Sequence, residues 1–251
     1  KENNAVSVLI GYGDGTFPVD NPATHPVGFS VTPSTALAAT DFNGDGLVDI
    51  TTGWEQGGAI VVYQNPGPAK AKSVWPSVTV GIVRSPEDAV FADLDGDGNL
   101  DVVSSCEGRE QSMYVHWAPA KQADYLKSSA WATEVIVATK QKQLWMFAEP
   151  AQIDARAGIE LFVSSKGANG SIGWLKLPTD LQQARKVSKW QFIKLRDAGW
   201  IMTLKALDMD GDGDSDLLFS DRKGTKRGVS WLENPGGEKV SSRGEWKEHA
   251  L

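Results

Sequence analysis

The chain has 251 residues, and 41% of them are hydrophobic, which is ample for a buried core. Its net charge of -7 argues against nucleic acid or an anionic membrane surface as the main partner. No apolar run approaches the roughly 18 residues of a membrane-spanning helix, so we expect no membrane insertion. The amino-terminal sequence lacks the layout of a signal peptide, and we expect any export signal to have been removed.

The 26 glycines, 12 prolines and 10 tryptophans predict many turns and many strands. Gly and Pro interrupt regular structure, and large aromatic side chains suit the pleated surfaces of sheets. The first segment of this kind, VSVLIGYGDGTF from Val6, is typical of a β-hairpin. We assign it to an incomplete repeat unit at residues 1–35. The single cysteine, Cys106, neither indicates nor excludes an oxidising compartment.

Three later segments share one acidic pattern: DFNGDGLVD from Asp41, DLDGDGNLD from Asp93 and DMDGDGDSD from Asp208. The last begins close to two repeat lengths after the second, and a degenerate copy, QIDARAGIELFV, lies in the gap. Asp154 and Glu160 remain in this copy. We interpret its glycine-aspartate centre as deleted, and we do not predict either residue as a metal ligand.

Tryptophans recur at similar intervals. One set opens short strand-like runs and consists of Trp75, Trp131, Trp190 and Trp246. A second set stands ahead of turn segments and consists of Trp117, Trp174 and Trp231. Because both sets follow the repeat, we expect them to pack between units and not to contact ligand. Each repeat then has four strands, with the acidic loop between the first and the second.

Four-stranded units repeated at this length are typical of the blades of a β-propeller, which bury their faces against neighbouring blades. The sequence therefore predicts an all-β fold and a single propeller domain over residues 1–251. Four full blades follow the partial blade at 1–35, at about residues 36–83, 89–137, 146–194 and 201–250. We expect the chain to be part of a larger ring. A closed four-blade ring with an extra hairpin and a five-blade ring lacking half a blade are the alternatives.

The acidic loops suit a hard cation, because their oxygen donors alternate with glycines that permit a tight backbone path. Ca²⁺, which takes roughly 6 to 8 oxygen ligands in relaxed geometry, fits them better than Mg²⁺. An EF-hand is excluded, because its twelfth position needs glutamate and these loops have Thr52, Ser104 and Phe219 there. We predict three calcium sites. Their side-chain ligands are Asp41, Asn43, Asp45 and Asp49; Asp93, Asp95, Asp97 and Asp101; and Asp208, Asp210, Asp212 and Asp216. Their carbonyl ligands are Leu47, Asn99 and Asp214.

These loops, together with VSVLIGYGDGTF, resemble the FG-GAP or VCBS repeats of integrin α-subunit-type calcium-binding propellers, and the resemblance covers essentially the whole chain. The phrase WLENPG and the tryptophan-opened strands are most similar to bacterial secreted or periplasmic members and to the propeller of fungal sugar-dehydratase enzymes. The resemblance implies an extracellular or periplasmic protein. The family includes adhesion receptors, lectins, polysaccharide lyases and dehydratases, so the resemblance implies fold more than function.

The family's geometry places ligands on the face opposite the calcium loops. Acids, bases and tryptophans that converge there suit a sugar ring or a uronate, through stacking and bidentate contacts. Trp145 and Trp200 break the spacing of the other tryptophans, which favours them as ligand contacts. The predicted ligand site consists of Trp145, Trp200, Glu87, Glu107, Arg109, Lys166, Asp221 and Arg222.

Two functions are compatible with this site. The first is a noncatalytic module that binds a glycan or a protein, and we favour it because spacing alone identifies no general acid-base pair. The second is a carbohydrate-active enzyme, a polysaccharide lyase or a sugar dehydratase, with its active site on the same face. Turnover that releases an unsaturated product from polyuronides would distinguish the enzyme.

Overall fold

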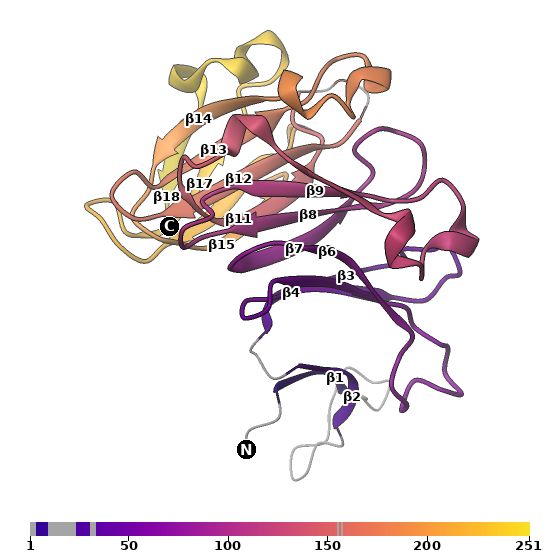
Figure 1. The fold of residues 1–251 in the computed structure, drawn as a ribbon. Helices are drawn as coiled ribbons and strands as arrows, with labels where there is room; N and C mark the ends of the chain where they lie inside the picture. Colours follow the sequence, from indigo (N-terminus) through magenta and orange to yellow (C-terminus); the bar gives the residue numbers. More distant parts are fainter. Residues whose placement is uncertain (1–3, 10–23, 31–33, 155, 157) are drawn as a thin grey trace.

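Figure 1 shows the computed structural model of the chain, which describes residues 4–9, 24–30, 34–154, 156 and 158–251. These residues form four antiparallel sheets of four strands and one two-stranded pair, which confirms the predicted all-β fold. The only helices in this part of the chain are short 3-10 turns, and none is long and apolar enough to cross a membrane.

The strands of each sheet follow one another along the chain, so each sheet is an antiparallel meander. Sheet I contains β3 (Ser34–Thr40), β4 (Asp49–Trp54), β5 (Ala59–Tyr63) and β6 (Ser77–Ile82). Sheet II contains β7 (Pro86–Ala92), β8 (Asp101–Cys106), β9 (Met113–Trp117) and β10 (Ala132–Val135). Sheet III contains β11 (Leu144–Ala151), β12 (Glu160–Lys166), β13 (Ser171–Lys176) and β14 (Gln191–Asp197). Sheet IV contains β15 (Ile201–Leu207), β16 (Asp216–Asp221), β17 (Gly228–Glu233) and β18 (Lys247–Ala250).

Most 3-10 turns lie between the third and fourth strands of sheets II, III and IV. They are η1 (Gln122–Asp124), η2 (Ser128–Ala130), η4 (Leu181–Gln183), η5 (Val187–Lys189), η6 (Gly237–Ser241) and η7 (Arg243–Glu245). The remaining turn, η3 (Val137–Thr139), precedes sheet III. At the amino-terminal end, β1 (Asn4–Leu9) pairs with β2 (Thr24–Ser30) in an antiparallel arrangement. The segment 10–23, which contains the predicted turn, lies outside the described residues.

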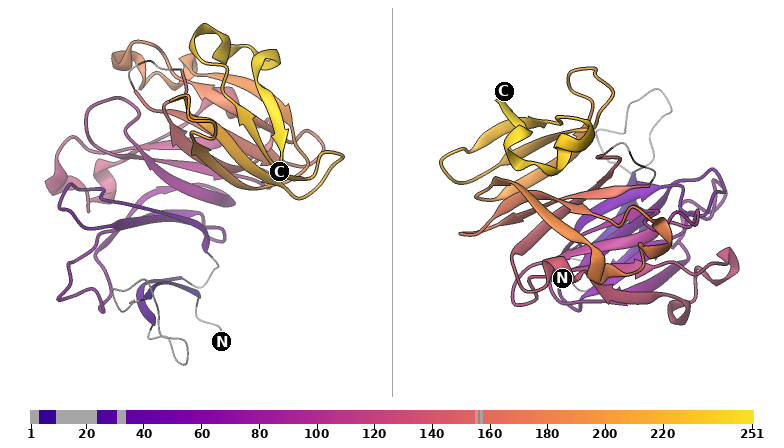
Figure 2. Two further views of the ribbon diagram at one scale, coloured as in Figure 1. Left: turned by 180° about the vertical axis from the view of Figure 1, so that it is seen from behind. Right: turned by 90° about the horizontal axis from the view of Figure 1, so that it is seen from above.

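The four sheets stand in chain order along an open arc (Figures 1 and 2). The first strands of neighbouring sheets contact one another: β3 with β7, β7 with β11, and β11 with β15. Each sheet has the strand order predicted for a propeller blade, and between its first and second strands lies an acidic loop or, in sheet III, the degenerate copy. The sheets of the described residues do not close into a ring.

The apolar core lies between neighbouring sheets and not at a single centre. One buried cluster joins sheets I and II, a second joins II and III, and a third joins III and IV. Phe42 in the first acidic loop stacks on Phe91 of β7, with ring centroids 5.3 Å apart. Strand β8 is buried along its whole length, because sheets cover both of its faces. Such packing is typical of blades that depend on their neighbours.

The tryptophans that open the fourth strands are buried and hydrogen-bonded, which agrees with the predicted packing role. The indole N–H of Trp131 donates to the carbonyl of Tyr125 at 2.9 Å, and that of Trp246 donates to Val240 at 2.8 Å. Trp190 makes the same bond to the carbonyl six residues earlier. Each ring therefore holds the turn before its strand while it fills the space between sheets.

A buried carboxylate on β7 joins sheets II and III. Asp88 Oδ2 accepts the backbone N–H of Ala148 on β11 at 3.0 Å. Burial raises the pKa of Asp88 from 3.8 to about 7, because the charged form loses its hydration. The protonated carboxyl keeps an oxygen acceptor for Ala148 without placing a charge between the sheets.

We predict that Asp88→Asn removes a pH dependence of stability. The folded pKa lies above the unfolded value, so the contribution of Asp88 is complete below about pH 4 and is lost as the pH rises through 7. Asparagine keeps the acceptor and never ionises. Denaturant unfolding at fixed calcium should show equal stability near pH 4 and a variant more stable at pH 8 by up to about 4 kcal/mol, at about 1.36 kcal/mol per pKa unit. A variant less stable at both pH values would contradict this.

Candidate metal loops and the opposite loop face

Each sheet has a loop between its first and second strands. These are loop I (residues 41–48), loop II (93–100), loop III (152–159) and loop IV (208–215). In loop I the Asp41 carboxylate accepts the N–H groups of Gly44 at 2.8 Å and Gly46 at 2.9 Å. Asp93 and Asp208 make the same two bonds in loops II and IV. Both glycines of loop I have positive φ, 75° and 82°, which explains why the pattern needs glycine there.

Carboxylates converge in these loops. The oxygens of Asp93, Asp95 and Asp97 lie within 4.8 Å of one another, and so do those of Asp208, Asp210 and Asp216. In loop I an amide takes part, since Asn43 Nδ2 donates to Asp45 Oδ2 at 3.1 Å. Clusters of oxygen donors of this kind could bind a metal ion, and a hard cation fits them best. The carbonyls of Leu47, Asn99 and Asp214 belong to the same loops, and their part in coordination stays a prediction.

Each predicted calcium site includes one carboxylate that is buried at the start of the second strand of its sheet. The residues in this position are Asp49, Asp101 and Asp216. Asp101 accepts N–H groups from Leu94 at 3.4 Å and Ala118 at 2.8 Å, so it joins the loop to the end of β9. Burial, and also the charge of Asp95, raises the pKa of Asp101 to about 8. The ionised form therefore needs a positive partner in the loop.

Sequence reasoning missed a cation beside loop II. Arg185, which follows η4 of sheet III, forms an ion pair with Asp95 through Nε, and its Nη2 lies 3.6 Å from Asp97 Oδ2. Its guanidinium also lies 5.0 Å from the ring centroid of Trp117. A neighbouring sheet thus supplies positive charge to two predicted metal ligands. The repeat pattern contains no signal for this contact, because Arg185 is far from the loop in sequence.

Loop III corrects one interpretation of the sequence. Ala92 pairs with Asp101 across loop II, and Ala151 pairs with Glu160 across loop III, so the two loops contain the same number of residues. The expectation that the centre of loop III is deleted is therefore wrong. Its residues are substituted.

The connections at the other end of the sheets form a second surface, which we call the loop face. Here the links between sheets bond to the loops that join second and third strands. Glu107 donates its N–H to the carbonyl of Ser85 at 3.0 Å, and Gly167 donates to Gly199 at 3.0 Å. Ser85 has a positive φ of 48°, which is uncommon for a residue with a side chain. These bonds hold the loops of the face against one another.

Four charged side chains from sheets I, II and III meet on the loop face. The carboxylate oxygens of Glu55, Glu87 and Glu107 lie within 4.8 Å of one another. Lys166, at the end of β12, forms an ion pair with Glu107, and its Nζ lies 3.8 Å from Glu87 Oε1. Burial, followed by the hydrogen bond and charge of Glu107, raises the pKa of Glu87 to about 7. A carboxyl group that changes its protonation near neutral pH therefore stands beside Lys166.

Trp200 adjoins this cluster. It is half-buried just before β15, and it bridges to Lys166 through the backbone. Three cations surround its indole ring, with Lys166 at 4.7 Å, Arg222 at 5.0 Å and Lys223 at 4.5 Å from the ring centroid. These distances are typical of cation–π contacts. Among the described residues the indole N–H has no hydrogen-bond partner.

The structure thus brings together five of the predicted ligand residues: Glu87, Glu107, Lys166, Trp200 and Arg222. Arg109 is exposed in the same loop as Glu107. Asp221 lies underneath, 4% exposed, where it pairs with Arg196 at 2.9 Å and accepts the N–H of Trp200 at 2.9 Å. It supports the face and is not available to a ligand.

The prediction that Trp145 contacts a ligand is wrong. Its side chain is fully buried, and its indole N–H donates to the carbonyl of Thr139 at 3.1 Å. It packs edge-on against Phe192, with ring centroids 5.3 Å apart. Trp145 therefore belongs to the core between sheets II and III.

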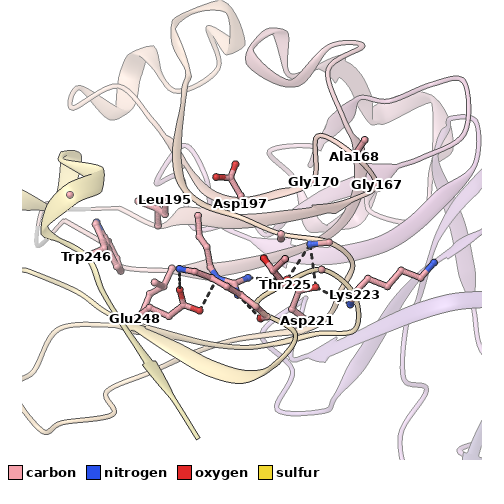
Figure 3. Close-up of a pocket in the computed structure, with 17 residues that line it drawn as sticks. Gly167, Ala168, Gly170, Leu195, Asp197, Asp221, Lys223, Thr225, Trp246 and Glu248 are labelled. Carbon is pink, nitrogen blue, oxygen red and sulfur yellow. Dashed lines mark hydrogen bonds and ion pairs between the residues drawn. The ribbon is translucent and has the colours of Figure 1, made fainter.

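The β16–β17 hairpin places basic side chains next to Trp200. Its exposed cations are Arg222, Lys223, Lys226 and Arg227. In the described part of the chain no ion pair joins Arg222 or Lys223 to a carboxylate. A pocket of about 940 Å³ opens beside the hairpin, and Figure 3 shows Asp197, Lys223 and Thr225 along it and Asp221 bonded to the backbone at its floor.

Comparison with known families supports the repeat. Residues 41–104 match the model of the FG-GAP-like repeat, and this stretch runs from loop I into β8. No curated protein matches the chain. The match contains loops I and II, and sheets III and IV repeat the same strand order. The chain therefore carries an FG-GAP-like repeat in blade-like sheets, as expected of an FG-GAP/VCBS-type repeat protein.

Proposed function

We propose that the protein is a calcium-stabilised binding module whose ligand is an anionic glycan held on the loop face. Calcium in loops I, II and IV stabilises the scaffold, and Trp200 with the basic hairpin contacts the ligand. The observation that carries the proposal is the half-buried Trp200 ring with three cations around it, two of which lack an acidic partner among the described residues. Calcium loops of moderate affinity suit an extracellular or periplasmic location, where FG-GAP repeats are typically found.

Acidic and basic groups are unevenly distributed between the two ends of the sheets, although Glu55, Glu87 and Glu107 also lie on the loop face. The aspartates of loops I, II and IV gather at one end, whereas Arg222, Lys223, Lys226 and Arg227 gather on the loop face. The chain therefore has a basic surface region although its net charge is -7. A polysaccharide with carboxylate or sulfate groups offers repeated anions for these cations and an apolar sugar face for the indole ring.

The binding surface is held in place before any ligand arrives. The buried Asp221 carboxylate accepts the N–H groups of Gly199 at 3.1 Å and Trp200 at 2.9 Å. It also accepts the N–H of Lys223, at the start of the hairpin loop. Asp221 thus fixes both the hairpin loop and the segment that carries the Trp200 ring. Few groups then have to be ordered when a ligand binds, so little binding free energy is lost.

We predict that calcium stabilises the chain through three loops. Each site contributes about 1.4 kcal/mol at a tenfold excess of calcium over the dissociation constant. Asp212→Asn keeps the acceptor for Asp214, which bonds at 2.9 Å, but removes one charge from loop IV. Thermal melts should show a lower Tm for the variant in calcium and the same Tm as wild type after chelation. An equal loss in both conditions would show that Asp212 acts without metal.

The anionic ligand can be tested by titration with polygalacturonate, a sulfated glycan and neutral dextran. We expect the two anionic polymers to bind, more weakly at high salt, and dextran not to bind. Trp200→Ala, Arg222→Ala and Lys223→Ala should each weaken binding several-fold, while folding survives. Lys121→Ala, which removes an exposed charge next to η1, is the matched control and should bind like wild type. An equal loss of binding affinity in Lys121→Ala would contradict the proposal, and so would tight binding of dextran.

A carbohydrate-active enzyme is the second candidate, because Glu87 with a pKa of about 7 stands beside Lys166 and Glu107. A lyase needs a proton donor and acceptor next to a positive group that neutralises the sugar carboxylate. Incubation with polyuronides would then release unsaturated ends, detected by ultraviolet absorbance, and Glu87→Gln would abolish them. Binding without such products supports the binding module.

A further inference from the structure

Loop III repeats a backbone hydrogen bond of the metal loops. The N–H of Arg156 donates to Asp154 Oδ1 at 3.2 Å, just as the N–H of Asp97 donates to Asp95 Oδ1 at 3.2 Å. The equal lengths of the two loops place Arg156 at the position of Asp97. A guanidinium group thus stands where the other loops have a carboxylate ligand.

The side chain of Arg156 contacts Asp154 in its own loop and Thr179 in the segment after β13. Its guanidinium forms an ion pair with Asp154, whose side chain is 5% exposed, and its Nη1 donates to Thr179 Oγ1 at 2.6 Å. Burial raises the pKa of Glu160 to about 7, and the charge of Arg156 opposes part of this rise. Glu160 accepts the N–H of Leu177 at 3.3 Å, the bond that Asp101 makes to Ala118 in sheet II. Asp154, a carboxylate of loop III, therefore has a positive partner that belongs to the chain.

The donor set of loop III does not fit calcium. Loop II and the residue that follows it supply four carboxylates, whereas loop III has Gln152 at the first ligand position and Arg156 at the third. Gln152 turns its amide onto the carbonyl of Arg156, at 2.9 Å. Of the two remaining carboxylates, that of Asp154 pairs with the guanidinium group, and that of Glu160 lines the same cavity. A divalent cation there would meet a fixed positive charge and too few oxygens.

We propose that Arg156 is a built-in replacement for the metal ion, so that sheet III keeps its structure without calcium. The chain then contains two kinds of blade. Sheets I, II and IV depend on the ion concentration, and sheet III does not. Removal of calcium loosens loops I, II and IV first and leaves loop III unchanged.

Hydrogen exchange measured by mass spectrometry tests this directly. Chelation should speed exchange in peptides of β16 and β17 at least tenfold and should leave peptides of β12 and β13 near their values in calcium. An equal acceleration in both sheets would overturn the proposal. This readout needs no ligand, so its outcome is independent of glycan binding on the loop face.

Variants of the full chain test the role of the charge. Arg156→Gln should lower Tm by about 5 °C or more, by the same amount in calcium and in chelator, because no metal is involved. Arg156→Lys keeps the charge and should retain most of the Tm. If Arg156→Lys and Arg156→Gln lower Tm by the same amount, the charge is not what stabilises the loop.

If the metal ligands are restored in loop III and Arg156 is removed, the loop should bind calcium. A variant that combines Gln152→Asp, Ala155→Gly, Arg156→Asp and Ala157→Gly gives loop III the donor pattern of loop II. Equilibrium dialysis with elemental analysis should find one more calcium ion per chain than in wild type, and the variant should melt lower than wild type only in chelator. The same calcium count in both proteins, with a folded variant, would contradict the proposal.

Discussion

The structure depends on a buried carboxylate at the start of the second strand of every sheet. The residues in this position are Asp49, Asp101, Glu160 and Asp216. Each accepts a backbone N–H just past the end of the third strand, so one side chain joins two strands at the rim of the sheet. Burial raises the pKa of all four, because the ionised form loses its hydration. A positive charge nearby is the condition under which this arrangement can hold an ionised carboxylate.

The four loops differ in how a positive charge can reach this carboxylate. Loops II and IV gather carboxylate oxygens that could bind a cation, and Arg185 of the next sheet approaches two aspartates of loop II. In loop I the side chains of Asn43 and Asp45 are hydrogen-bonded to each other. Loop III carries its own guanidinium in Arg156. The connections at the other end of the sheets hold a different chemistry. The glutamates, Lys166 and Trp200 lie there.

The sequence predicts the strand order, the acidic loops and the packing tryptophans, because each recurs with the blade and local patterns decide it. Prediction from the sequence fails where contacts with residues distant in the chain determine the surroundings of a side chain. Trp145 and Trp200 break the same spacing, yet Trp145 is enclosed by η3 and Phe192 while Trp200 remains half-buried. Alignment of loop III without a gap would have revealed Arg156 opposite Asp97. The contact of Arg185 with loop II has no local signal, since its partners lie in another blade.

Contacts between a loop and the following sheet explain how charge at one end supports the whole arc. Gln122 of sheet II donates to the carbonyl of Asn43 in loop I at 2.8 Å, and Asn234 of sheet IV donates to that of Ile153 in loop III at 2.9 Å. Arg185 makes the corresponding contact with loop II. A cation that orders a loop therefore also orders the surface against which the next sheet packs. Since a blade is stable only against its neighbours, the loops stabilise the interfaces between sheets as much as the sheets themselves.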